Sequence, residues 1–153
     1  MKFSLITLAI VTAVCLSVST CKALIPKANL KPSEYDLGLT FEQAQKDSKP
    51  ILGVFYVDWC TYCQRFMPKL NTVRNLNKND LNVVLINVDD PYNEKLAKEY
   101  KITGFPTVYI IDAVYDNRVH IDSPYLDSVV NLNKEVQRYL KFRNLVTKGV
   151  KCK

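Results

Sequence analysis

The chain has 153 residues, of which 48% are hydrophobic and 24% charged, and its formal net charge at pH 7 is +6. That length suits one domain with a core of its own behind an N-terminal leader. The lysines are scattered without interleaved aromatic residues, which argues against a nucleic-acid partner. Only Cys60, Cys63 and Cys152 lie outside the leader region, too few for a disulfide scaffold.

Residues 1–23 have the layout of a secretory leader, with a lysine at position 2, an apolar stretch and then small polar residues. Two interpretations stay open. The leader is cleaved after Ala23 as a signal peptide, or Cys21 becomes a lipid anchor, because 18–21 resembles a degenerate bacterial lipobox. An uncleaved anchor is a third interpretation. Each predicts an exported protein, periplasmic or otherwise extracytoplasmic, and the anchored forms would be membrane-attached.

Residues 24–39 contain prolines and lysines without periodicity and are predicted to be a linker between the leader and the domain. A capping-box pattern at 40–43 predicts a short helix that ends near Asp47. The run 51–57 is rich in β-branched and aromatic residues, which indicates a buried strand. The domain is therefore expected to begin at residue 40 and, with the strands and helices expected further along the chain, to span residues 40–147.

Two cysteines, Cys60 and Cys63, follow that strand, where the apolar spacing changes to the three- and four-residue period of a helix. At the first turn of a helix, free backbone N–H groups and the positive end of the dipole favour a thiolate at Cys60. Cys63 lies about one helical turn further on, so the two sulfurs can form a disulfide. One thiol can attack a partner's disulfide while the other resolves the mixed disulfide.

Two other interpretations of the cysteine pair stay open, half of a zinc site and a structural disulfide. A zinc site needs two more ligands, and the remaining candidates, His120 and Cys152, are not in ligand spacing. We therefore expect no metal and no other cofactor. His120 is expected to be a surface residue of a strand. Cys152 is expected to be a free thiol, with a third redox cysteine or an intermolecular link as the alternatives.

The rest of the chain alternates strands and helices. In chain order we expect a polar turn at 75–82, a strand at 83–88, a helix at 91–100 started by Asp90 and Pro91, an antiparallel edge pair of strands at 107–112 and 119–121, a last helix at 124–141 and a basic tail at 148–153. Alternating strands and helices with short connections predict an α/β fold, in which a mixed sheet is covered by helices on both faces.

At its cysteine motif the chain resembles the thioredoxin family, whose active site has the pattern Trp-Cys-x-x-Cys. The matching residues here are Trp59, Cys60, Thr61, Tyr62 and Cys63. Pro68 stands where the family places a proline in its active-site helix, and 102–107 is similar to the family's second signature, a loop with a cis proline. The resemblance covers about 40–142 and is nearest to the thioredoxin-like domains of exported bacterial thiol–disulfide interchange proteins.

This resemblance implies a thioredoxin fold and a role for each site residue. Cys60 would be the attacking, more exposed thiol and Cys63 the buried resolving thiol. Trp59 would shield the pair and shape the docking surface. The backbone before Pro106 would pair with an extended segment of the partner. The supporting residues of the site would be Thr61, Tyr62 and Phe105.

The chain departs from the family at the positions that handle the proton of the buried thiol. Val54 stands where family reductases commonly carry a buried Asp, and Leu85 stands where a lysine commonly faces it. Losing both is physically consistent, since either charge buried alone would be costly. Solvent or Asp58 would then have to accept the proton of Cys63. In the alternative interpretation, Asp58 lies close to Cys60 and opposes thiolate formation there.

The predicted function is that of a thiol–disulfide oxidoreductase acting on exported protein disulfides, as a reductase or isomerase more than an oxidase. The dipeptide between the cysteines, Thr61 and Tyr62, lacks a charge of the kind that stabilises the thiolate of a strong oxidase. A reductase would need a membrane-bound or soluble thiol electron donor. The alternatives are a non-enzymatic thioredoxin-fold binding module and an assembly factor dedicated to one partner.

Overall fold

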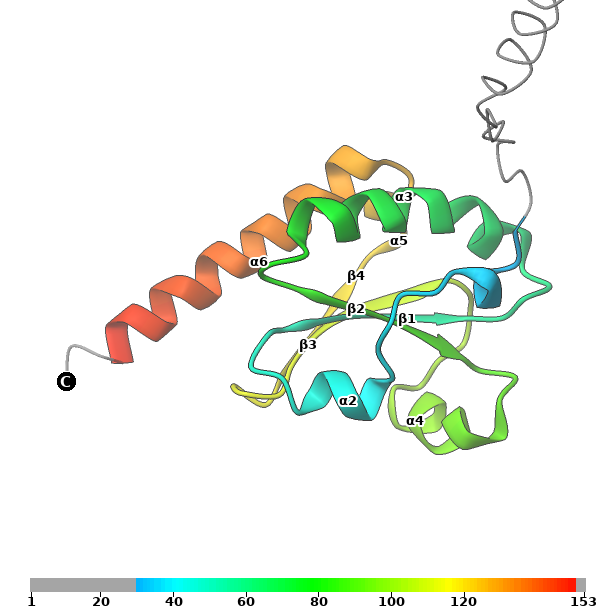
Figure 1. Ribbon diagram of the computed structural model, residues 1–153, viewed down its shortest axis with the longest axis horizontal. Coiled ribbons are helices and arrows are strands. Elements are labelled where there is room, and N and C mark those ends of the chain that lie inside the picture. The colour runs from blue at the N-terminus through cyan, green and yellow to red at the C-terminus, as the bar shows by residue number, and fades with distance from the viewer. Residues whose placement is uncertain (1–29, 151–153) are drawn as a thin grey trace, which may run out of the picture.

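The computed structural model describes residues 30–150 and shows one sheet between two layers of helices (Figure 1). The strands are β1 (Ile51–Tyr56), β2 (Asn82–Asn87), β3 (Thr107–Asp112) and β4 (Asn117–Ile121). The α-helices are α2 (Phe41–Gln45), α3 (Thr61–Asn77), α4 (Glu94–Glu99), α5 (Ser123–Leu126) and α6 (Val129–Val150), with 3-10 turns η2 (Pro32–Glu34) and η3 (Pro91–Asn93). The predictions for Cys21, Ala23 and Cys152 lie outside the described residues.

The sheet has the strand order β2-β1-β3-β4. β1 pairs in parallel with β2, whereas the β1–β3 and β3–β4 pairs are antiparallel. The predicted mixed sheet and its antiparallel edge pair are therefore confirmed. A parallel pair requires a crossover connection, and α3 supplies it between the end of β1 and the start of β2.

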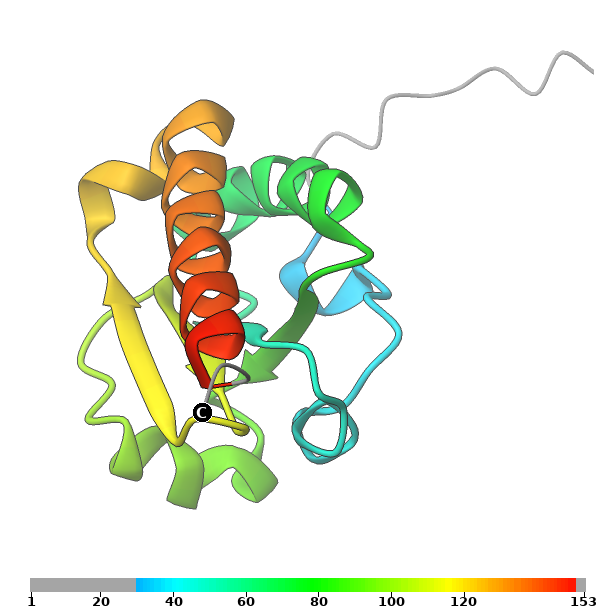
Figure 2. The same cartoon turned by 90° about the vertical axis from the view of Figure 1, so that its left-hand side faces the viewer.

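Side chains of β1 alternate between two apolar cores, one on each face of the sheet. Val54 belongs to a core shared with Met67 of α3 and Leu132 of α6. Phe55 belongs to a second core that includes Phe41 of α2. Accordingly, α3 and α6 cover one face of the sheet and α2 and α4 cover the other (Figures 1 and 2). The prediction that helices cover both faces is confirmed.

Two helix starts that the sequence predicts are confirmed by their caps. The Thr40 hydroxyl accepts a hydrogen bond from the N–H of Gln43 at 3.2 Å, and the Gln43 side chain accepts one from the N–H of Thr40 at 2.9 Å. The Asp90 carboxylate accepts a hydrogen bond from the N–H of Tyr92 at 3.0 Å and so caps the 3-10 turn η3, which α4 follows; the segment predicted as one helix at 91–100 therefore starts as a 3-10 turn. Each cap satisfies backbone donors that the first helical turn leaves free.

The end of the chain differs from the prediction of one helix at 124–141. Two helices, α5 and α6, are separated at Asp127 and Ser128. The Ser128 hydroxyl accepts a hydrogen bond from the N–H of Val130 at 3.1 Å, as a capping residue does. α6 then continues to Val150, so the first residues of the predicted tail are helical.

α3 runs to Asn77, past the start of the turn predicted at residue 75. The Asn77 side chain is buried and donates hydrogen bonds to the carbonyl of Val73 at 2.7 Å and to Asn133 Oδ1 at 2.8 Å. It also accepts a hydrogen bond from Gln137. These partners in α6 hold a turn-forming residue type inside the helix, which explains the longer α3.

The described part of the predicted linker lies against the domain. Pro32 in η2 is buried, and Leu37 belongs to the same core as Val54. Residues 32–37 therefore belong to the folded domain and not to a linker. Between residues 30 and 150, no helix combines the length and the apolar character needed to span a bilayer.

Candidate active site

Cys60 lies between the end of β1 and the start of α3, as the sequence predicts. It is the N-cap of α3, and its Sγ accepts a hydrogen bond from the N–H of Cys63 at 3.2 Å. Negative charge at a helix N-terminus is stabilised by the free N–H groups and the helix dipole. The N–H of Cys63 thus points at Cys60 Sγ, where it would stabilise negative charge that develops on this sulfur during reaction.

Cys63 is the more buried of the two thiols. Its relative exposure is 0%, compared with 8% for Cys60, and both are free thiols. Burial, and secondly the hydrogen bond with Cys60, raises the pKa of the Cys63 thiol to about 12. Cys63 is therefore protonated at neutral pH.

The loop at 102–107, called the proline loop below, faces Cys60. The peptide bond between Phe105 and Pro106 is cis, as the family resemblance implies. The Cys60 thiol donates a hydrogen bond to the carbonyl oxygen of Phe105 at 3.6 Å. The hydroxyl of Thr107 donates to the carbonyl of Gly104 at 2.7 Å. The structure thus brings together the two segments that the sequence singles out, the cysteine motif and the proline loop.

Trp59, which follows β1, contacts the segment after β2 and the proline loop. Its side chain is 70% exposed. The indole Nε1 donates a hydrogen bond to Asp89 Oδ2 at 3.0 Å, and the ring meets that of Phe105 edge-on at 6.2 Å. Asp89 follows β2, so this contact ties the turn after β1 to the end of β2. No sequence pattern points to Asp89 as the partner of Trp59.

The two residues between the cysteines lie on the outer surface of α3. Thr61 is exposed, and Tyr62 is 72% exposed. The guanidinium of Arg65 lies over the Tyr62 ring, 5.8 Å from its centroid. Tyr62 is therefore available to a docked partner.

Asp58 is held by a segment far away in the sequence. Its carboxylate accepts hydrogen bonds from the N–H of Ser33 at 2.9 Å and from the Ser33 hydroxyl at 2.7 Å. Its carbonyl accepts one from the side chain of Gln64 at 2.9 Å. The carboxylate proposed as a base for Cys63 is thus occupied by two donors. The contribution of Ser33 was missed, because no sequence pattern links residues so far apart along the chain.

Val54 and Leu85 are register partners in the parallel pair of β1 and β2. Val54 is fully buried, and Leu85 packs against the same apolar core, which also contains Cys63. The two apolar residues therefore lie side by side at the positions where family reductases commonly carry opposite charges. This arrangement leaves neither charge buried without its partner.

His120 takes no part in the cysteine site. It lies on the edge strand β4, its side chain is 45% exposed, and its Nδ1 is 3.1 Å from Asp122 Oδ1. The prediction of a surface histidine is confirmed. Within the described residues, no group of three or more His, Cys, Asp or Glu side chains could hold a metal ion.

An open groove starts at the proline loop and runs along α3. Its walls come from α3, from Phe105 and Pro106, and from α5. The α3 wall consists of Tyr62, Arg65, Phe66 and Lys69. Sequence reasoning missed this wall, although the spacing of three and four residues could have revealed it, because such a stripe lies on one face of a helix.

Sequence comparisons with known proteins agree with the family resemblance of the cysteine motif. The sequence model of the family "Thioredoxin" matches residues 35–123. Bovine protein disulfide-isomerase A4 is 33% identical over 86 residues, which cover 56% of this chain and 13% of that protein. The chloroplastic thioredoxin-like protein HCF164 of Arabidopsis thaliana is 31% identical over 74 residues, covering 48% of this chain and 28% of that protein. The chain thus spans only a small part of these relatives.

A solved thioredoxin structure is also similar to this chain. A mutant thioredoxin from Halobacterium salinarum NRC-1 is 28% identical and superposes with a TM-score of 0.54, covering 63% of this chain and 80% of that one. The family match extends over more than half of the chain and contains both cysteines and Pro106. With the fold and the cysteine pair in place, the prediction of a thiol–disulfide oxidoreductase is supported. The chain belongs to the thioredoxin family.

Proposed function

We propose that this protein exchanges disulfides with other proteins, with Cys60 as the attacking thiol and Cys63 as the resolving thiol. The hydrogen bond from the N–H of Cys63 to Cys60 Sγ at 3.2 Å is the observation that carries this assignment. This hydrogen bond stabilises negative charge on Cys60 Sγ, its acceptor. Cys63 is fully buried, and burial disfavours the charged form of its thiol. The two thiols therefore differ in reactivity before any substrate binds.

In the reducing direction the reaction has two steps. The Cys60 thiolate attacks one sulfur of the partner's disulfide, the partner's S–S bond breaks, and its second sulfur leaves as a thiolate that takes up a proton. Cys63 then loses its proton and attacks Cys60 Sγ, and the mixed-disulfide bond between Cys60 and the partner breaks. The partner's first sulfur leaves as a thiolate and takes up the proton that Cys63 lost, directly or through solvent. The partner departs as a dithiol with two electrons, and the chain retains a Cys60–Cys63 disulfide.

The partner would bind as an extended segment beside the proline loop. The Phe105 carbonyl lies 3.6 Å from Cys60 Sγ, so backbone groups before Pro106 are close to the attacking sulfur. Pairing of a substrate strand with this backbone would bring the substrate's disulfide to Cys60. Exposed Trp59 and Tyr62 would flank the bound segment.

We further propose that the protein acts as a reductase or isomerase, supplied by a membrane-bound or soluble thiol donor. The support is the uncharged pair Thr61 and Tyr62 between the cysteines, because a strong oxidase stabilises its thiolate heavily. The test is the reduction potential of the Cys60–Cys63 pair in glutathione buffers. A value near the roughly −270 mV of thioredoxin supports the proposal, and one near the roughly −120 mV of a strong oxidant overturns it.

We also propose that the protein acts outside the cytoplasm, on disulfides of exported proteins. The support is the leader pattern of residues 1–23. The intact mass of the mature protein tests it in the native host. A chain that begins at Leu24 indicates a cleaved signal peptide, and a chain that begins at a diacylglyceryl-modified Cys21 indicates a lipid anchor. A full-length chain in the cytoplasm contradicts export.

A further inference from the structure

The groove beside the cysteines has a basic wall. Arg65 and Lys69 are four residues apart on α3, and both line the groove with Tyr62 and Phe66 between and beside them. Residues at this spacing project from one face of a helix. The opposite wall is formed by α5 and the residue after it, with Leu126 contributing apolar surface.

The two positive charges of this wall are not neutralised by ion pairs within the described part of the chain. Neither Arg65 nor Lys69 forms an ion pair with any residue between 30 and 150. Arg65 only stacks over Tyr62, at 5.8 Å from the ring centroid. One acidic residue, Asp127, lines the far side of the groove, so the groove carries two positive charges and one negative charge.

The groove begins at the proline loop, next to Cys60. Phe105 and Pro106 line it, and the carbonyl of Phe105 contacts Cys60 Sγ. A segment that places its disulfide at Cys60 and continues along the groove would therefore pass Arg65 and then Lys69. Groups on that segment would meet positive charge within one to two turns of α3.

We propose that the preferred substrates are protein segments that carry acidic side chains beside the disulfide, together with an apolar residue that contacts Phe66 and Leu126. This inference rests on the proposed function and specifies the substrate class of the same site. Charge complementarity selects the occupant, because cations at the rim of a docking surface favour association with acidic partners. Asp127 would disfavour acidic groups on the far wall, so the acidic side chains would face α3.

The test uses disulfide peptides with the same length and apolar residues, which differ only at the two positions beside the disulfide. These positions carry Glu, Gln or Lys. With the full chain, we expect kcat/KM to fall in that order, by about three- to tenfold from Glu to Lys at low ionic strength. The difference should shrink at about 0.3 M salt, because exposed charges are then screened.

Charge reversal of the wall provides the second arm. The variant Arg65→Glu with Lys69→Glu should prefer the Lys peptide over the Glu peptide. The variant Arg65→Gln with Lys69→Gln should show little preference for any peptide. It replaces the charge-reversal variant in the test if that variant does not fold. The matched control is Lys134→Glu with Lys141→Glu, two exposed lysines of α6 outside the groove, which should keep the wild-type order.

The outcomes separate this inference from the proposed function. Equal rates for the three peptides, or an equal loss of preference in the control variant, overturn the inference and leave the disulfide exchange intact. Reduction of every peptide no faster than by the Cys60→Ser variant overturns the proposed function, and the inference with it. Retained preference for the Glu peptide after reversal of Arg65 and Lys69 also overturns the inference.

Discussion

Val54 of β1 and Leu85 of β2 are direct register partners, and both pack in the apolar core that contains Cys63. In reductases of the family these positions commonly carry a carboxylate and a lysine. Here the surroundings of the buried thiol are apolar on this side, and the pKa of Cys63 is raised to about 12, mainly by burial. In the proposed reaction, Cys63 would therefore pass its proton to solvent or to the leaving thiolate.

Val54→Asp should destabilise the protein, because the new carboxylate would be buried without a partner. We expect the free energy of unfolding at neutral pH to fall by about 3 kcal/mol or more. The double variant Val54→Asp with Leu85→Lys should recover part of this loss, since the two side chains are neighbours across the strands. Urea unfolding measures both, and a double variant no more stable than Val54→Asp alone would contradict the neighbour relationship.

The reduced protein should lose stability at alkaline pH. The pKa of Cys63 is about 12 in the folded protein, against an ordinary value of 9.0. Between these values the unfolded chain releases the proton and the folded chain keeps it, so the free energy of unfolding falls as pH rises above about 9. The slope is at most about 1.4 kcal/mol per pH unit.

Urea unfolding of the reduced protein between about pH 8 and pH 10 measures this slope. The range stops there because the pKa values of Tyr56 and Tyr139 are also raised, from 10.0 to about 12, and add to the slope at higher pH. The control is Cys63→Ala, which should lack the Cys63 contribution. An equally steep decline in wild type and Cys63→Ala would refute the assignment.

The fold could be predicted from the sequence largely because its signals are local. The apolar run before Cys60 and the helical spacing after it place the cysteine pair at a strand-to-helix junction, and the structure has it there. Thr40 and Asp90 mark helix starts through side chains that cap their own helices. The antiparallel edge pair also follows from two short apolar runs separated by a turn.

The features that could not be predicted depend on contacts between distant residues. Asn77 stays helical because Asn133 and Gln137 of α6 satisfy its amide. Ser33 reaches Asp58, and this contact makes residues 32–37 part of the domain and of the active-site surroundings. Such pairings leave no periodicity in the sequence, so composition alone indicated a turn at 75–82 and a linker at 24–39.

Ser33→Ala should test how far this N-terminal segment supports the active-site turn. It removes the 2.7 Å hydrogen bond from the Ser33 hydroxyl to Asp58 and keeps the one from the backbone. We expect a loss of about 1 kcal/mol in the free energy of unfolding. Ser48→Ala is the matched control, because Ser48 is also exposed and its hydroxyl has no hydrogen-bond partner among the described residues. Equal effects of both substitutions would argue against a role for Ser33.

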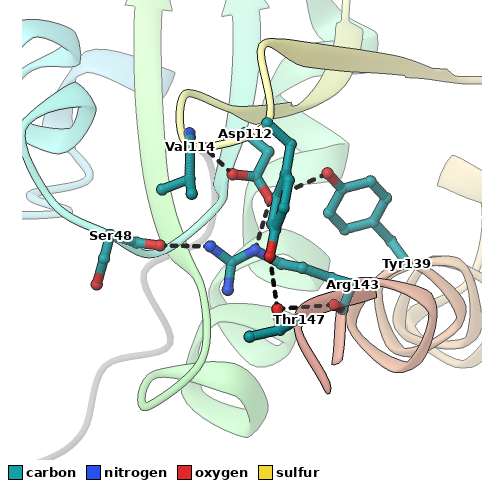
Figure 3. A network of polar contacts seen from close by, with 7 residues as sticks. Ser48, Asp112, Val114, Tyr139, Arg143 and Thr147 are labelled. Atoms are coloured by element: carbon teal, nitrogen blue, oxygen red, sulfur yellow. Dashed lines mark hydrogen bonds and ion pairs between the residues drawn. The ribbon is translucent and has the colours of Figure 1, made fainter. Parts of the chain in front are cut away.

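A buried ion pair attaches α6 to the end of β3 (Figure 3). Asp112 is 1% exposed, and its carboxylate accepts hydrogen bonds from Arg143, from the Tyr139 hydroxyl at 3.1 Å and from the N–H of Val114 at 3.1 Å. Arg143 also donates to the carbonyl of Ser48 at 2.6 Å. The network joins three segments that are far apart in the sequence.

Arg143→Ala should therefore cost about 3 kcal/mol in the free energy of unfolding, because it leaves the buried Asp112 carboxylate without its cation. Arg138→Ala is the control. Arg138 pairs with Glu135 but is 73% exposed, so its loss should cost less than about 1 kcal/mol. Thermal or urea unfolding compares the two, and similar losses would show that the Asp112 pair contributes no more than a surface pair.

Covalent trapping of a substrate tests most directly whether Cys60 is the attacking thiol. The Cys63→Ser variant is mixed with a disulfide peptide, and mass spectrometry of its proteolytic fragments locates the bound peptide. We predict a stable mixed disulfide on Cys60, because the resolving thiol is absent, and no adduct on Cys63 in the Cys60→Ser variant. A Cys63 adduct in Cys60→Ser that forms as fast as the Cys60 adduct, or no adduct on Cys60 at all, would contradict the account.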